Sequence, residues 1–353
     1  FGSSMSDVAF PNDFVLCDGW VQVPTYDEEK VVMAKQRWRG LSIEAIFVTE
    51  FRCTADYVAD ACRDGRVRLS GSPCQSGDLV QNGDSIIHQL SITEPAFRAG
   101  TIKVVHEDKA AGVLVVSKPA GIPCHPQGPY RRATLVSILR ESYLKKQDAY
   151  CHPVTRLDRL TSGICILATS KAGARRLTAL LPDISKLYLA RVCGRWAHSS
   201  LLGKCCDCEP VAKKPRTDSW FTVSEPLLLQ KHKEGQPLTT VVDSSGKAAT
   251  TKVLLLGASD ESSLLMCQPV TGRTHQIRAH LQHLGHPIAG DPVYGDGQAD
   301  AVEICLHAVA YTWKKDVGGL PGRHLLSTGC PKWWTEPWAV VQEAVESVGA
   351  LGG

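Results

Sequence analysis

Near its middle the chain reads His152-Pro153-Val154-Thr155-Arg156-Leu157-Asp158-Arg159-Leu160-Thr161-Ser162-Gly163. A carboxylate therefore stands between Arg156 and Arg159, and a turn follows before the apolar run 164–168, which predicts a buried strand. Neighbouring cations favour the ionised form of an aspartate, and this is the form that acts as a nucleophile. Asp158 is therefore a candidate nucleophile, although a loop that only forms structural ion pairs fits the same residues.

Two further stretches combine polar side chains with helical or strand periodicity. Residues 271–281 read TGRTHQIRAHL, and a helix is expected over 275–284. His275 and Arg278 are three residues apart and fall on the same side of such a helix. His275 and His280 are five apart, so they do not form the i, i+4 pair of metal ligands. Residues 186–194, KLYLARVCG, predict a strand with one polar ring, that of Tyr188.

These three stretches together resemble the RluA-type pseudouridine synthases. The first is similar to the family's HRLD-x-x-TSG motif and the third to its K-x-Y-x-A motif. The second, continued through 285–295, is similar to its GRTHQIR-x-H…PI-x-GD-x-x-YG motif, while 116–126 and 304–308 resemble its KPAG-x-P-x-HP and LHA elements. The resemblance runs in the family's order from about residue 95 to 313. It implies an α+β pseudouridine synthase fold with a mixed, mainly antiparallel central sheet flanked by helices.

The resemblance implies an isomerase that breaks the N1–C1′ bond of uridine, rotates the base and joins C5 to C1′ without a cofactor. Asp158 matches the family's nucleophile, and Arg278 matches the arginine that pairs with it and would keep it ionised. Tyr188 matches the tyrosine that stacks on the target base and is a candidate for removing the C5 proton. Ile277 would complete the pocket wall, and Arg156 matches the arginine that fills the space left by the flipped uridine. The other residues expected to contact RNA are Arg159, Lys118, His125, Arg273, His275, Gln276 and Thr161.

Details of the motifs are most similar to the eukaryotic branch that modifies tRNA. Residues 125–131, HPQGPYR, and 37–40, RWRG, carry this resemblance, which implies uridine 32 of the anticodon loop as the target. Thr155 stands where the family usually has His, at a position that orients the loop. The alternatives are a non-catalytic RNA-binding protein on the same scaffold, or a synthase acting on rRNA or mRNA uridines. A glycosidase is disfavoured because it needs two flanking carboxylates, and Asp291, the only other acid near these motifs, lies in a Gly-Asp-Pro turn.

The length of 353 residues predicts two domains. Phe1-Gly2-Ser3-Ser4 before Met5 is typical of a cloning remnant. Apolar residues at helical spacing, followed by short strands around tight turns, predict a small α+β module. Residues 65–68 and 82–84 of this module resemble S4-like RNA-binding modules. The expected organisation is an N-terminal extension over 1–35, the S4-like module over 36–95, the catalytic domain over 96–320 with an insertion at 197–218, and a C-terminal extension over 321–353.

Charge is unevenly distributed, although the net charge is only +3. Residues 96–218 hold 21 basic and 9 acidic side chains, whereas residues 1–95 hold 8 and 14. The basic middle predicts a polyanionic partner such as a nucleic acid, although a solvated basic face fits the same count. The resemblance implies that this partner is RNA, in particular tRNA.

Fourteen scattered cysteines are typical of an intracellular protein with reduced thiols. Only Cys205, Cys206 and Cys208 cluster, which is too few ligands for zinc, so we expect no metal. The sequence contains no run of about 18 apolar residues, so no membrane-spanning helix is predicted. We expect a monomer in the cytoplasm or the mitochondrion; the basic run 213–216, KKPR, makes the nucleus an alternative.

Overall fold

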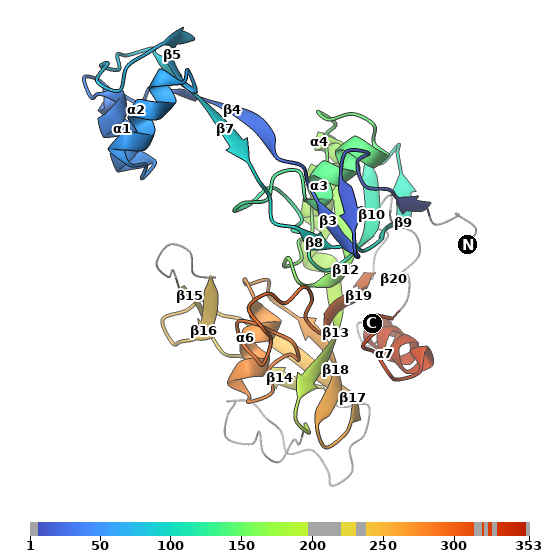
Figure 1. Ribbon diagram of the computed structural model, residues 1–353. Helices are drawn as coiled ribbons and strands as arrows, with labels where there is room; N and C mark the ends of the chain where they lie inside the picture. Colours follow the sequence, from blue (N-terminus) through green and yellow to red (C-terminus); the bar gives the residue numbers. More distant parts are fainter. Residues whose placement is uncertain are drawn as a thin grey trace. The chain divides into compact units, whose positions relative to one another are not determined.

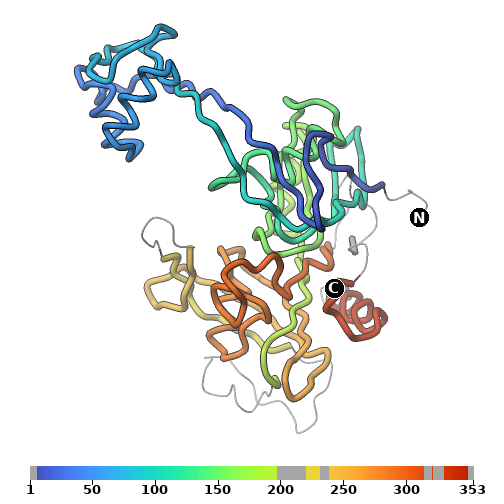
Figure 2. The backbone as a smooth tube through the Cα atoms, in the orientation of Figure 1, coloured from blue at the N-terminus to red at the C-terminus, as the bar shows by residue number. Residues whose placement is uncertain are grey.

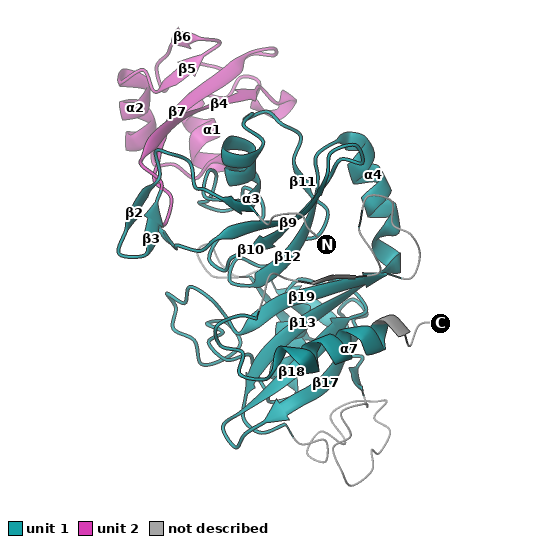
Figure 3. Ribbon diagram, turned by 90° about the vertical axis from the view of Figure 1, so that its right-hand side faces the viewer, with its two compact units in different colours: residues 1–22, 96–353 teal, residues 23–95 magenta. Residues whose placement is uncertain are grey.

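The computed structural model describes residues 6–196, 220–230, 238–313, 320, 324–326 and 330–350. The expected insertion at 197–218, with its cysteine cluster and basic run, lies outside these residues. The chain divides into two compact units (Figure 3). Unit 1 comprises Phe1–Gln22 and Ala96–Gly353, and unit 2 comprises Val23–Pro95.

Unit 1 is built on one mixed sheet, whose strands are labelled in Figure 1. The strand order is β1-β9-β10-β12-β19-β13-β18-β17-β14, with β11 paired to β12 and β20 to β19. All these pairs are antiparallel except β12 with β19. The expected mixed, mainly antiparallel sheet is therefore confirmed. The strands are β1 (Ser6–Val8), β9 (Ile102–Asp108), β10 (Val113–Lys118), β11 (His152–Pro153), β12 (Ser162–Ala168), β13 (Ile184–Cys193), β14 (Phe221–Val223), β17 (Thr251–Ala258), β18 (Ser262–Pro269), β19 (Leu306–Trp313) and β20 (His324–Leu326).

The parallel pair β12–β19 joins segments that lie far apart in the sequence. Ser162 is paired with His307 and Gly163 with Ala308, and Oγ of Ser162 lies 2.8 Å from Nδ1 of His307. Gly163 has a φ of 117°, and a Cβ atom there would collide with the backbone of Ala308. Only glycine therefore allows the two strands to approach so closely, directly after the loop that carries Asp158.

The helix expected over 275–284 is confirmed as α6 (Gln276–His283), one of several helices in unit 1. Helix α4 begins after Ser170, whose hydroxyl accepts a hydrogen bond from the Gly173 amide, as an N-cap does. It buries Ala174 and Leu177 in one cluster with residues of β10 and β12. Figure 3 shows α7 lying against β13 and β18, where its apolar side chains join a second cluster. The helical elements are α3 (Leu135–Ile138), the π-helical turn η2 (Leu139–Tyr143), α4 (Lys171–Leu180), the 3-10 turn η3 (Leu181–Asp183), α6 (Gln276–His283) and α7 (Trp338–Ala350).

Two smaller sheets complete unit 1. One has the order β2-β3-β8 and the other is the hairpin β15-β16. Figure 2 follows the backbone of unit 1, in which the loop before β12 and helix α6 are joined by a hydrogen bond between Asp158 and Arg278. The strands of the small sheets are β2 (Val15–Cys17), β3 (Trp20–Gln22), β8 (Phe97–Arg98), β15 (Leu227–Gln230) and β16 (Thr239–Val242).

Unit 2 packs two helices on the four-stranded sheet β4-β7-β5-β6. The hydroxyls of Ser42 and Thr54 cap the helices, and Gly65, with a φ of 70°, follows the second one as the Asp64-Gly65 pair predicts. The S4-like character of this unit stays a prediction. Its elements are β4 (Tyr26–Met33), η1 (Gln36–Trp38), α1 (Ile43–Glu50), α2 (Ala55–Arg63), β5 (Val67–Leu69), β6 (Ser72–Pro73) and β7 (Ser85–Ile92).

Candidate active site

The structure brings Asp158 and Arg278 together. Asp158 lies on the loop between β11 and β12, and its side chain is 32% exposed. Arg278 lies in the first turn of α6, is 4% exposed, and donates from Nη1 to Oδ2 of Asp158 over 3.1 Å. Among the described residues, neither Arg156 nor Arg159 forms an ion pair with Asp158. The cation that accompanies the carboxylate therefore comes from a distant helix, not from its neighbours in sequence.

A second carboxylate fixes the arginine. Asp291 is completely buried, and its two oxygens accept from Nε and Nη2 of Arg278 over 2.7 and 2.8 Å. Oδ1 of Asp291 also accepts from the amides of Val293 and Tyr294, and the Tyr294 ring lies 4.9 Å from the guanidinium carbon. The bidentate pair leaves Nη1 as the guanidinium nitrogen that reaches Asp158. From the sequence, Asp291 was assigned to a turn; it is in a turn and also holds Arg278.

His275 stands beside the same carboxylate. Its Nε2 lies 3.7 Å from Oδ2 of Asp158, and its Nδ1 lies 3.0 Å from the hydroxyl of Tyr294. The residue precedes α6 with a left-handed backbone, φ 53°. Burial lowers the pKa of His275, so the ring is neutral near pH 7.

Tyr188 and Ile277 are both buried in unit 1. Tyr188 is in β13, paired with Ala308 of β19 and Cys267 of β18. Burial is the main cause that raises the pKa of the Tyr188 phenol, and the negative charge of Asp158 adds to it. The phenol therefore keeps its proton at neutral pH, which favours stacking over proton removal as its contribution. Ile277 lies directly before Arg278, 6% exposed.

Lys118 lies at the end of β10, where it is 1% exposed. Its ammonium group donates to the carbonyls of Pro119, Ile122 and Arg159 over 2.8, 2.9 and 3.3 Å. All three donors of the ammonium are thereby used within the protein. This geometry favours a role in fixing the backbone beside Asp158 and differs from that of a surface contact to RNA.

Two other buried groups hold the same loop. The thiol of Cys124 contacts both the amide and the carbonyl of Leu157, over 3.3 and 3.4 Å. The Thr155 hydroxyl accepts from the Ile166 amide over 2.9 Å, and Thr155 is 3% exposed. Thr155 therefore anchors the loop to β12, consistent with a position that orients the loop.

The remaining predicted contact residues separate into exposed and buried groups. Arg156 and Arg273 are exposed, and Arg159 lies over the Tyr130 ring at 5.9 Å. Gln276 is buried: its amide donates to the carbonyl of Thr250, and its side-chain oxygen accepts from the Arg273 amide. Within the described residues, buried polar atoms of His125 and Thr161 have no hydrogen-bond partner.

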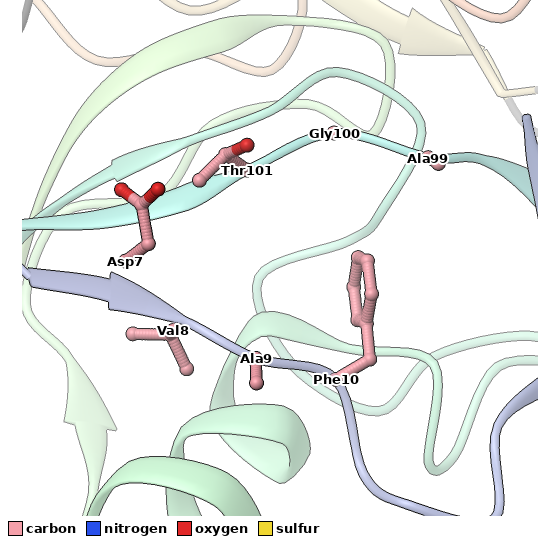
Figure 4. A pocket seen from close by; sticks show the side chains of 7 residues that line it. All are labelled: Asp7, Val8, Ala9, Phe10, Ala99, Gly100 and Thr101. Atoms are coloured by element: carbon pink, nitrogen blue, oxygen red, sulfur yellow. The ribbon is translucent and has the colours of Figure 1, made fainter. Parts of the chain in front are cut away.

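A shallow hollow of about 410 Å³ lies elsewhere in unit 1 (Figure 4). It is lined by residues of β1, by Phe10 and by 99–101, and none of the predicted site residues lines it. Across the described ranges, no three His, Cys, Asp or Glu side chains are grouped to hold a metal ion. No helix in the described part of the chain has the length and apolarity to span a bilayer.

Comparison with known proteins identifies the family. Residues 112–283 match the family model for RNA pseudouridylate synthase. The tRNA pseudouridine(31) synthase of Saccharomyces cerevisiae is 32% identical over 90% of this chain and 77% of that protein. RNA pseudouridine synthase 7 of Arabidopsis thaliana is 30% identical over 86% of this chain and 73% of that protein.

Other relatives are longer than this chain. The mitochondrial tRNA pseudouridine(32) synthase of Saccharomyces cerevisiae is 32% identical over 75% of this chain and 52% of that protein. The chain likewise spans about half the length of the mouse and human pseudouridylate synthases that it matches at 34% identity. Among solved structures, human RNA pseudouridylate synthase domain containing 1 superposes with a TM-score of 0.48 and 22% identity, covering 69% of this chain and 94% of that one. The chain belongs to the RluA-type branch of the RNA pseudouridine synthase family.

Proposed function

We propose that this protein isomerises uridine to pseudouridine in tRNA, with Asp158 as the nucleophile. The observation that carries the proposal is the partly exposed Asp158 carboxylate, which accepts from a buried arginine on one oxygen only. An ionised, accessible and oriented carboxylate is what a nucleophile requires. The relatives named as tRNA pseudouridine synthases support the substrate class.

The residues around Asp158 have different functions in the proposed reaction. Arg278 orients Asp158 through its hydrogen bond, and Tyr188 with Ile277 forms the apolar wall against which a flipped base stacks. Arg156, exposed beside Asp158, is placed to occupy the gap in the RNA. Asp291 is fully buried and bound to Arg278, so it does not reach a sugar. This argues against a glycosidase, which needs a second carboxylate at the bond.

Tritium release tests the proposal, because tritium at C5 of uridine is lost when C5 becomes bonded to C1′. We expect the wild type to release tritium from tRNA transcripts and Asp158→Asn to release none, while both bind tRNA alike. Asp300→Asn removes the same charge from an exposed site and serves as the control. Equal release from the wild type and Asp158→Asn would contradict the proposed nucleophile and favour a non-catalytic RNA-binding protein.

Within this function we propose uridine 32 as the target, in a mitochondrial or cytoplasmic tRNA and by a monomeric enzyme. Two relatives are named as tRNA pseudouridine synthases for positions 31 and 32, so these two uridines are the ones to compare. Anticodon stem-loops in which either uridine is replaced by cytidine separate the two positions. Loss of product only with the position-32 replacement is expected, and product from rRNA or mRNA fragments alone would instead support the alternative substrates.

A further inference from the structure

A chain of polar contacts leads from the hairpin β15-β16 to the nucleophile. The amide of Thr240 in β16 donates to the Tyr294 hydroxyl over 2.7 Å. That hydroxyl lies 3.0 Å from Nδ1 of His275, and Nε2 on the opposite side of the ring faces Oδ2 of Asp158 at 3.7 Å. The His275 and Tyr294 rings are perpendicular, with centroids 5.6 Å apart.

The contacts of the Tyr294 hydroxyl allow an arrangement in which it donates to the ring of His275. A backbone amide can only donate, so the Tyr294 oxygen accepts from Thr240 and its own proton is available to Nδ1 of His275. A neutral imidazole that accepts at Nδ1 carries its hydrogen on Nε2. In this arrangement the Nε2–H bond points toward the carboxylate of Asp158.

The two oxygens of Asp158 have different surroundings. Oδ2 accepts from Arg278 and is the atom that His275 faces. Oδ1 has no hydrogen-bond partner among the residues that the structure describes. The separation of 3.7 Å is too long for a hydrogen bond, but catalytic contacts of this kind shorten when substrate is bound.

We propose that His275 is a positioning residue, whose neutral Nε2–H, set by Tyr294, holds Oδ2 of Asp158 together with Arg278 and leaves Oδ1 to attack. The proposal rests on the proposed function. His275 was expected from the sequence to contact RNA; here it acts on the nucleophile. In this tautomer neither ring nitrogen has a free lone pair, so His275 does not remove the C5 proton.

The substitution Tyr294→Phe tests the proposal through its pH dependence. Without the hydroxyl, the proton of His275 distributes between both nitrogens, and protonation of the ring at lower pH restores a hydrogen on Nε2. The charged groups that face the ring are Asp158, Asp291 and Arg278. We expect the single-turnover rate of Tyr294→Phe to be about twofold below wild type at pH 8 and to approach it near pH 5.5. An equal loss at both pH values would indicate a merely structural role and overturn the proposal, as would no loss.

Variants of His275 complete the experiment. We expect His275→Gln, which keeps a neutral donor, to retain more single-turnover activity than His275→Leu, with unchanged affinity for tRNA. His283→Gln, at an exposed position on the same helix, is the control. If the two His275 variants are equally slow, or if tRNA affinity falls instead, the proposal is wrong.

The tautomer can be measured without turnover. Nitrogen NMR of histidine-labelled protein, with the His275 signals assigned by their loss in His275→Gln, reports which ring nitrogen bears hydrogen. Hydrogen on Nδ1 would overturn the proposal even in an active enzyme. Absence of pseudouridine with hydrogen on Nε2 would instead count against the proposed function.

Discussion

Replacement of Asp291 by asparagine tests whether a buried carboxylate holds the arginine of the active site. In the wild type, Asp291 and Arg278 share two hydrogen bonds of 2.7 and 2.8 Å, and the two side chains are 0% and 4% exposed. Asp291→Asn keeps the shape of the side chain but leaves one acceptor oxygen in place of two. Its amide N–H groups then face Nε of Arg278 or, in the flipped orientation, Nη2 of Arg278 together with the amides of Val293 and Tyr294, all of which are donors.

The magnitude follows from the burial of the pair. Loss of one charge from a buried ion pair costs about 3–5 kcal/mol, because the other charge stays buried without its partner. Since the amide oxygen keeps one hydrogen bond and Asp158 still accepts from Nη1, we expect the lower end, about 3 kcal/mol. For a unit of this size, each kcal/mol lowers Tm by about 2–4 °C, so unit 1 should melt about 6–12 °C earlier.

Scanning calorimetry measures this shift, and tritium release below the transition measures activity. We expect the folded Asp291→Asn protein to be slower than wild type because Arg278 is no longer fixed. Asp300→Asn, an equal loss of charge at an exposed position, should melt with the wild type. A Tm of Asp291→Asn within about 2 °C of wild type would refute the reasoning that the ion pair with Asp291 holds Arg278 in place.

Three further changes are predicted. Gly163→Ala should lower the free energy of unfolding by at least about 2 kcal/mol, measured in urea, because the new methyl group meets the Ala308 backbone at a φ of 117°; unchanged stability would contradict the close approach of β12 and β19. Burial lowers the pKa of His307 from 6.5 to about 4. Between these two values the unfolded state binds more protons than the folded state. The free energy of unfolding should therefore fall by roughly 1.4 kcal/mol for each unit by which the pH is lowered, and His307→Gln should lose this pH dependence. Lys118→Met leaves three backbone carbonyls without their donor and should lower Tm, whereas a purely RNA-contacting Lys118 would change tRNA affinity alone.

Much of the scaffold of unit 1 was predictable from local sequence. The apolar run 164–168 lies in strand β12, and the helix expected over 275–284 is α6, because burial on a sheet and on a helix impose different periodicities. The mixed sheet followed from the family resemblance. Strand β4 was not expected within 1–35, because its first residues, Tyr26-Asp27-Glu28-Glu29-Lys30, lack the apolar alternation that predicts a strand.

The candidate site was predictable in its residue types but not in its contacts. Asp158 and Arg278 are 120 positions apart, and only the fold brings them together. Asp291 lies in a Gly-Asp-Pro turn, which fully accounts for an aspartate without a second role. Lys118 was expected to contact RNA, because the sequence does not reveal that three carbonyls converge on the end of β10.

The parallel pairing of β12 with β19 affects when the enzyme becomes active during its synthesis. Ser162 and His307, which meet in this pairing, are 145 positions apart, so the strand on the other side of the nucleophile's loop is made late. Pairings of such long sequence separation form slowly. A nascent chain that ends before Leu306 contains Asp158, Tyr188 and Arg278 but lacks β19, which lies between β12 and β13. We therefore expect the proposed activity to arise only after nearly the whole of unit 1 has left the ribosome. Truncation within β19 should abolish tritium release although the proposed catalytic side chains are still present.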